Sequence, residues 1–515
     1  MKYMKKTENN SAFLLQFNYI SISIKIGDKM KELLEYLRNI ADANYIATLM
    51  HWEMDVVAPK KSIDYLIDVK TKVELESFKL ATSPKFKELL DNVIKSSEFN
   101  EITKEEQIYL KQLQKDYEKE ALVPEDFYAE YSSLCSEANA IWAEAKNKKD
   151  YQLFKPYLIK IIEYTKKYYM YKYPNSDNLY DEMLNEYEEG LTSNKIDELF
   201  SRLKEELIPI IKNLKIKSST TKLEKYTNEE LLSIARYLLE YIGFDNTRGT
   251  LGIYPHGYTC KLNNNDVRIA FSNNKSIFDH VCTIIHEGGH GIFEQSISPN
   301  LAKYPIYDIN KYALHESQSR FFENILGRNI NFWLPIYDEI KSQLKLNITV
   351  DEFVNELNKA EPSLIRTEAD ELTYCLHIIL RYEIEKGLFN GEINPEDLPT
   401  IWNKKMKEYL GIDVPNDADG LLQDVHWSQG SFGYFPSYLI GSIFDGMLIE
   451  NINKNVGNIN TLLKEGKINE ITKYLQENIY AYGGAYNINE VCQRLCHQDL
   501  TIEPLVKYFK SKYQK

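Results

Sequence analysis

The segment His286-Glu287-Gly288-Gly289-His290 restricts the fold of this 515-residue chain more than any other feature. Two histidines four residues apart lie on one face of a helix, about one turn apart, so a helix here lets both imidazoles bind the same ion. Zinc suits such a site, because catalytic zinc keeps three protein ligands and leaves a fourth position to water. Glu287 can then accept a proton from that water as general base. The alternative is a chance match on a buried helix, which a third ligand and substrate-binding residues would argue against.

A candidate third ligand, Glu316, follows within residues 312–324, where the apolar side chains have helical spacing. A carboxylate on a second helix can complete a zinc site between two antiparallel helices. Alternatively, Glu316 forms a helix-surface pair with Arg320, four residues later. Weaker candidates for the third ligand are Glu294, Asp308 and Glu323.

Most of the chain from Met30 onwards has helical periodicity. One stretch differs: between Thr247 and Ser272 glycines and a proline interrupt the helices, and residues 266–271 alternate as a strand does. We therefore expect a small sheet or hairpin just before the metal helix. The helices that we expect fall at residues 31–44, 65–81, 104–121, from 125 onwards, 312–324, 365–384 and within 459–512.

Three places carry candidate substrate-binding residues. His256 lies on a turn beside the expected sheet, whose edge strand could align a peptide backbone, although an ordinary surface histidine is the alternative. Arg366 could bind a carboxylate with both arms of its guanidinium, or it could pair at the surface with the aspartate four residues later. The glycine-rich loop at 420–436 is unusual in a helical chain, and it contains His426 and Tyr434.

Charge and cysteine content exclude several classes of protein. The formal net charge of -14 argues against a nucleic-acid partner and against a polybasic membrane-surface protein. The six cysteines are dispersed without C-x-x-C pairs, which is typical of a reducing compartment. No stretch has the roughly twenty apolar residues of a membrane span. We expect a cytoplasmic protein in which residues 1–28 are a non-essential extension and residues 29–515 form one catalytic body.

Five motifs together resemble the carboxypeptidase Taq family of metallocarboxypeptidases, and looser similarity covers nearly the whole chain from about residue 30. The motifs are Asp266-Val-Arg-Ile269, His286-Glu-Gly-Gly-His290, His315-Glu-Ser-Gln318, Ile365-Arg-Thr-Glu-Ala-Asp370 and Gly420-Leu-Leu-Gln-Asp-Val-His-Trp427.

The resemblance implies a large, mainly α, zincin-type fold with a deep central groove, a small β-sheet beside the metal helix and often a homodimeric state. It implies removal of single C-terminal residues from peptides with a free C-terminus, using one Zn²⁺ per chain, or Co²⁺. Carried over by position, the resemblance implies that the metal ligands are His286, His290 and Glu316 and that the general base is Glu287. It implies that Arg366 holds the terminal carboxylate of the substrate. The residues that it implies line the site are His256, His426 and Tyr434.

The chain departs from the family pattern in three places. It has His256-Gly257-Tyr258 where the family usually has His-Pro-Phe, and Ala270 where a threonine is common. Gly288 and Gly289 also put adjacent glycines into the metal helix, at a cost of about 1 kcal/mol each relative to alanine. These departures affect substrate preference and positioning, but they leave the ligands and the base in place.

The function that we expect is therefore metal-dependent carboxypeptidase activity through an activated water, with Glu287 as general base. A zinc oligopeptidase that cuts internally is the nearest alternative, since it shares the metal chemistry without needing a carboxylate clamp. A non-catalytic helical binding protein is a more distant alternative, and the complete set of ligands and base argues against it.

Overall fold

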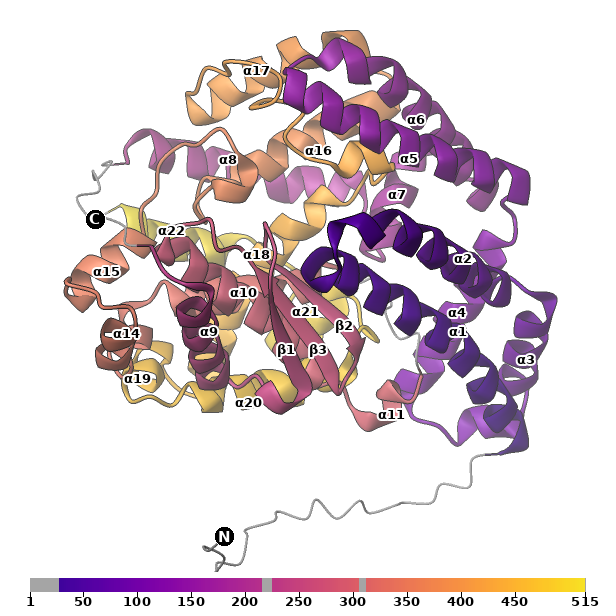
Figure 1. Ribbon diagram of the computed structural model, residues 1–515, viewed down its shortest axis with the longest axis horizontal. Coiled ribbons are helices and arrows are strands. Elements are labelled where there is room, and N and C mark those ends of the chain that lie inside the picture. The colour runs from indigo at the N-terminus through magenta and orange to yellow at the C-terminus, as the bar shows by residue number, and fades with distance from the viewer. Residues whose placement is uncertain (1–26, 215–224, 305–311, 515) are drawn as a thin grey trace, which may run out of the picture.

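The computed structural model describes residues 27–214, 225–304 and 312–514, and helices make up most of it (Figure 1). The mainly α fold with a small sheet is therefore confirmed. The extension expected at residues 1–28 lies almost entirely outside the described residues, as does the weaker ligand candidate Asp308. None of the helices in the described ranges combines the length and the apolar character that a membrane span requires.

The N-terminal half of the chain consists of helices, and the helices predicted at residues 31–44, 65–81, 104–121 and from 125 onwards correspond to α1, α2, α4 and α5. In this region α1 packs against α2, and α5 packs against α6. The start of α4 shows why such a match is possible. Thr103 and Glu106 form a capping box there, so the helix begins at Lys104, directly after Thr103. The helices here are α1 (Asp28–Trp52), α2 (Ile63–Ala81), α3 (Pro84–Ile94), α4 (Lys104–Glu120), α5 (Glu125–Lys148), α6 (Tyr151–Lys172), α7 (Leu179–Tyr187), α8 (Ser193–Lys212) and α9 (Asn228–Ile242).

A three-stranded sheet follows α9, as the change in periodicity predicted. Its strands are β1 (Gly249–Ile253), β2 (Tyr258–Asn263) and β3 (Asp266–Phe271), in the order β1-β3-β2. The pair β2 and β3 is an antiparallel hairpin, whereas β1 runs parallel to β3. Figure 1 shows the strands in the foreground with α10 behind them.

The helix that carries the H-E-x-x-H motif, α10 (Ile277–Gln295), contacts β2, β3, α9 and α12 (Tyr312–Arg320). Its two adjacent glycines allow these close approaches. A Cβ on Gly288 would lie 2.5 Å from a side-chain carbon of Ile242 on α9, and one on Gly289 would lie 2.7 Å from the backbone Cα of Ser319 on α12. The helix-weakening glycines therefore permit packing that larger residues would obstruct.

The C-terminal part is helical again, and one predicted helix boundary is wrong there. Residues 365–371 do not begin a long helix; Arg366–Glu368 forms a 3-10 turn and α16 begins at Tyr374. The Asp370 carboxylate accepts hydrogen bonds from the backbone N–H groups of Leu372 and Thr373, at 2.9 and 3.0 Å. Such local bonds compete with helix formation, so the helix starts after them.

In the remaining C-terminal part, α18 packs against α12, α16 and α22. This part includes a π-helical segment, Phe321–Gly327, that continues directly from α12. The helices are α11 (Pro299–Ala302), α13 (Ile330–Trp333), α14 (Tyr337–Gln343), α15 (Val350–Leu357), α16 (Tyr374–Asn390), α17 (Leu398–Leu410), α18 (Phe435–Asn455), α19 (Ile459–Lys464), α20 (Ile468–Asn478), α21 (Ile488–Cys496) and α22 (Glu503–Tyr513).

Candidate metal centre and adjoining cavity

The structure brings the three candidate ligands together where α10 faces α12. One ligand atom from each of His286, His290 and Glu316 lies within 4.8 Å of the others. The closest pair is His290 Nε2 and Glu316 Oε2, 3.5 Å apart. Ligand bonds of about 2.0–2.2 Å in a tetrahedral site place donor atoms roughly 3.4 Å apart. Two imidazoles and one carboxylate also form the donor set of several catalytic zinc sites, so these residues fit the ion.

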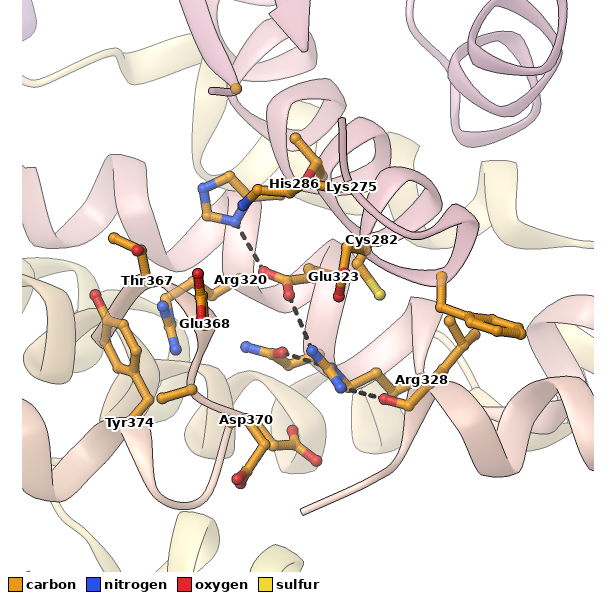
Figure 2. Close-up of a pocket in the computed structure, with 18 of the residues that line it drawn as sticks. Lys275, Cys282, His286, Arg320, Glu323, Arg328, Thr367, Glu368, Asp370 and Tyr374 are labelled. Atoms are coloured by element: carbon orange, nitrogen blue, oxygen red, sulfur yellow. Dashed lines mark hydrogen bonds and ion pairs between the residues drawn. The ribbon is translucent and has the colours of Figure 1, made fainter. Parts of the chain in front are cut away.

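Glu323 and Glu294, the weaker ligand candidates, have other partners. The Glu323 carboxylate pairs with His286 Nδ1 at 3.0 Å through Oε2, and its Oε1 accepts a hydrogen bond from Arg328 at 3.2 Å (Figure 2). Glu294 pairs with His315 at 3.0 Å and with Lys261 at 3.2 Å. With Nδ1 taken by Glu323, His286 has Nε2 available for a metal.

Electrostatic interactions around these ligands shift their pKa values in opposite directions. Burial acts to lower the pKa of His286, but its hydrogen bond to Glu323 and the charges of Glu316 and Glu323 outweigh burial and raise that pKa to about 9. Burial, with the charge of His315, lowers the pKa of His290 to about 4. Burial opposes ionisation of Glu316, but His290, His286 and Arg320 outweigh it and lower the pKa of Glu316 to about 2.

Glu287, the candidate general base, lies between α10 and strand β2. It is 6% exposed, and burial raises the pKa of its carboxyl group while the charge of His286 acts to lower it. The Thr259 hydroxyl is 2.7 Å from Glu287 Oε2. A buried carboxylate with a raised pKa beside metal ligands is suited to accept a proton.

Arg320 is not the surface partner of Glu316 that helical spacing suggested as an alternative. Its Nη1 does lie 3.6 Å from Glu316 Oε1, but the Arg320 side chain is buried and that of Glu316 is only partly exposed. The guanidinium stacks over the ring of Tyr374 at 3.9 Å, and Nε donates to Ser442 at 2.9 Å. Arg320 therefore places a fixed positive charge beside the candidate metal centre, which sequence reasoning missed because it read the pair as solvent-exposed.

A cavity of about 730 Å³ adjoins these residues. Its walls come from α10, α12 and the π-helical segment after it, the end of α15 and the stretch before α16. Of the candidate residues, those that line it are His256, His286, Glu287, Glu316, Glu323 and Arg366.

His256 is exposed on the turn between β1 and β2, at the edge of this cavity. Its ring meets that of Tyr254 edge-on, with 5.1 Å between the centroids. Partial burial and the nearby Lys275 lower the pKa of His256, which favours the neutral imidazole. His256 is thus exposed, and the next residue in the chain, Gly257, lies against Glu287.

His426 and Tyr434 lie behind the cavity wall. Their rings stack with centroids 5.5 Å apart, and Tyr434 contacts Tyr438, which lines the cavity, at 5.1 Å. Burial lowers the pKa of His426 to about 4 and leaves the ring neutral.

The loop that carries His426 is anchored by Glu385 on α16, a residue that sequence reasoning missed. The Glu385 carboxylate accepts hydrogen bonds from Trp427 Nε1 at 2.8 Å and from the Gly433 N–H at 2.9 Å. Burial raises the pKa of Glu385 to about 7 against these donors. A lone acidic residue on an apolar helix face was the signal that could have identified it.

Arg366 is buried and pairs with Asp424 rather than with Asp370. Its Nε and Nη2 donate to Asp424 Oδ1 at 2.9 and 2.8 Å, and Nη1 donates to the Tyr374 hydroxyl at 2.9 Å. Arg381 donates to the other oxygen of Asp424 at 2.6 Å. Two guanidinium groups share one carboxylate, so this cluster retains one net positive charge at the cavity wall.

Comparisons with known proteins agree over nearly the entire chain. Residues 32–513 match the family described as Carboxypeptidase Taq (M32) metallopeptidase. Carboxypeptidase 1 of Bacillus subtilis is 36% identical, covering 94% of this chain and 97% of the relative. The crystal structure of the M32 carboxypeptidase from Deinococcus radiodurans is 26% identical with a TM-score of 0.89, covering 95% of this chain and 99% of that one. A structure of Pyrococcus furiosus carboxypeptidase is 30% identical with a TM-score of 0.88, at the same coverage.

Proposed function

This chain belongs to the carboxypeptidase Taq family of metallopeptidases, and we propose that it removes single C-terminal residues from peptides at the centre formed by α10 and α12. The observation that carries the proposal is the meeting of His286, His290 and Glu316 beside Glu287, in a cavity that Arg366 also lines. Internal cleavage is not favoured, because the relatives are named carboxypeptidases.

We propose one zinc ion per chain, held by His286, His290 and Glu316, with cobalt as an alternative. When bound, zinc would polarise a water molecule and the scissile carbonyl as a Lewis acid. Glu287 accepts the proton of that water and passes it to the leaving amine nitrogen. The raised pKa of the buried Glu287 supports this role, because a base that must later act as an acid works best near the operating pH.

Arg366 binds the terminal carboxylate of the substrate in this proposal. The net positive charge of the Arg366, Arg381 and Asp424 cluster supports it, since a second carboxylate restores neutrality in a buried place. Tyr374 and Tyr438 lie against the Arg366 guanidinium at 5.8 and 5.1 Å and limit its movement. His256 closes the edge of the cavity, while His426 and Tyr434 support the wall through Tyr438.

We also propose that residues 29–515 form one catalytic body, because the main hydrophobic core joins residues from Met30 to Phe509. The free cysteines and the net charge of -14 support a cytoplasmic protein without nucleic-acid or membrane partners. The family resemblance supports a homodimer.

The proposal is tested with a short free-acid peptide and its C-terminally amidated twin, incubated with zinc-loaded protein and analysed by mass spectrometry. We expect residues to be lost one at a time from the free-acid peptide only, with loss of activity in a chelator and in Glu287→Gln. Internal fragments would replace the proposal with an oligopeptidase. Full turnover by Glu287→Gln, with its metal content unchanged, would remove Glu287 from the role of base.

A further inference from the structure

The side chain of Thr259 points from strand β2 towards the metal helix. Successive residues of a strand face opposite sides, and the neighbours Tyr258 and Cys260 pack with Trp52 on the far side of the sheet. Thr259 pairs in register with Ile269 of β3, which belongs to the main core. The threonine therefore lies on the face of the sheet that covers α10.

On that face the Thr259 hydroxyl meets two acceptors of one residue. It is 2.7 Å from Glu287 Oε2 and 3.0 Å from the backbone carbonyl oxygen of Glu287. A hydroxyl has one proton, and an ionised carboxylate is the stronger and closer acceptor, so the bond to Oε2 dominates when Glu287 is ionised. Through these two contacts, Thr259 on the strand holds both the carboxylate of Glu287 and the backbone of the helix that carries it.

The other carboxylate oxygen of Glu287 lies against Gly257. A Cβ at Gly257 would be 2.9 Å from Glu287 Oε1 and 2.5 Å from Thr283 Cγ2, so a side chain there would displace one of them. Both Gly257 and Glu287 line the cavity. The two oxygens thus have different neighbours: a hydroxyl that donates to Oε2, and a bare backbone that leaves room for Oε1.

We infer that Thr259 is a positioning residue for Glu287, and that Gly257 leaves the space in which Glu287 Oε1 lies in this chain. A glutamate side chain has several rotatable bonds, and restricting it before the reaction removes an entropic cost from the proton-transfer step. This inference rests on the proposed role of Glu287 as base. It assigns no contact with substrate to Thr259, which acts only through the glutamate.

The test compares Thr259→Val, which keeps the shape but removes the hydroxyl, with Thr259→Ser, which keeps the hydroxyl. In zinc-loaded enzyme we expect Thr259→Val to lower kcat by between about 10-fold and 100-fold, because small misplacement of a reacting group has effects of this size. KM and metal content stay within about twofold of the unaltered protein, because ligands and Arg366 are untouched. Thr259→Ser restores most of kcat.

Thr472→Val is the matched control, because it also removes a buried hydroxyl that donates to a backbone carbonyl, that of Ile242 at 2.9 Å. It lies on α20, away from the cavity lining, and we expect it to lower the melting temperature while kcat is unchanged. Gly257→Ala places a methyl group against the other oxygen of the Glu287 carboxylate. It provides a second test if Thr259→Val does not fold. It too lowers kcat with metal content unchanged.

Two results would overturn the inference: an unchanged kcat in Thr259→Val, or equal losses in the Val and Ser variants. An unchanged kcat in Gly257→Ala would overturn the claim that Gly257 leaves necessary room for the Glu287 carboxylate. A different result would contradict the proposed function: full turnover by Glu287→Gln would show that Glu287 is not the general base. An inactive Glu287→Gln together with a fully active Thr259→Val would overturn only the positioning role.

Discussion

His286 Nδ1 and the carboxylate of Glu323 are 3.0 Å apart, so the first histidine of the metal motif is held by a residue 37 positions later. Glu316 and Glu323 are seven residues apart, two helical turns, and both face α10. Glu316 lies beside His290 Nε2, whereas Glu323 pairs with His286 Nδ1. In the proposed metal site, the carboxylate that orients a ligand, Glu323, is thus distinct from the carboxylate that completes the ligand set, Glu316.

Replacing Glu323 should weaken metal binding more than it slows the loaded enzyme. We expect Glu323→Ala to raise the metal dissociation constant by about 10- to 100-fold, the usual effect of losing such a partner, because the imidazole loses its orientation. Glu323→Gln keeps a hydrogen-bond acceptor and should have a smaller effect. Competition with a chromophoric chelator measures both, and equal affinity in all three proteins would contradict the assignment.

Metal uptake should release a proton below about pH 9. The pKa of His286 in the metal-free protein is about 9, whereas that of His290 is about 4, so only His286 is protonated at neutral pH. A metal must displace that proton, so affinity rises about tenfold for each pH unit and levels off above the pKa of His286. Calorimetry in two buffers of different ionisation enthalpy counts the protons. Affinity that does not change between pH 7 and pH 9 would exclude this competition.

The same pKa shift gives the metal-free protein a pH-dependent stability. A histidine whose pKa rises on folding stabilises the native state fully below its unfolded value of about 6.5, and this contribution is lost as pH rises through about 9. Denaturant titrations of the metal-free protein between pH 6 and pH 10 should show this loss. Glu323→Gln should reduce it, because the variant removes the negative charge of Glu323, which helps to raise the pKa of His286.

Arg366→Ala should selectively impair cleavage at a free C-terminus. Losing one partner of a buried charge pair costs about 2–5 kcal/mol, so kcat/KM for a free-acid peptide should fall by about 30-fold or more. Arg366→Lys keeps the charge but not the planar fork, and it should recover only part of the loss. Asp424 keeps Arg381 as a partner in both variants, which limits the structural damage. The ratio of free-acid to amidated cleavage is the measurement, and an unchanged ratio would remove Arg366 from this role.

The two adjacent glycines of α10 should respond differently to alanine. At Gly288 the new Cβ would meet the ends of the Ile242 and Leu239 side chains, which can move. At Gly289 it would meet the backbone of α12, 2.7 Å from Ser319 Cα, which cannot move without displacing the helix that carries Glu316.

Gly288→Ala should therefore change the free energy of unfolding little, since a helix-propensity gain of about 1 kcal/mol offsets the crowding. Gly289→Ala should lose about 1–3 kcal/mol of stability and bind metal more weakly, because α12 must shift away from His290. Denaturant unfolding and chelator competition measure the two effects. Equal behaviour of the two variants would show that α12 does not depend on Gly289 for its approach.

Much of the architecture could be predicted because it depends on local patterns. Periodicity located helices such as α2 and α4 to within two residues, and alternation located β3 at residues 266–271. The H-E-x-x-H spacing placed His286 and His290 on one helix face. These features follow from the geometry of a single element, and residues near in sequence determine them.

Contacts between distant elements were decided only by the tertiary structure. Spacing offered several carboxylates for the third ligand, and packing of α10 on α12 decides that Glu316 meets His290 while Glu323 holds His286. Arg366 was expected to begin a helix and to pair with Asp370 or bind substrate, yet it lies in a 3-10 turn and pairs with Asp424, 58 residues later.

Local periodicity shows which face of a helix is buried but not which side chain of another element lies opposite. That choice depends on how whole helices and strands pack, and a shift of one turn would exchange the partners. The sequence by itself therefore determined the helices, the sheet and the chemical types of the site residues. The folded structure decided which carboxylate, guanidinium and hydroxyl meets which partner, because these contacts join residues that only packing brings together.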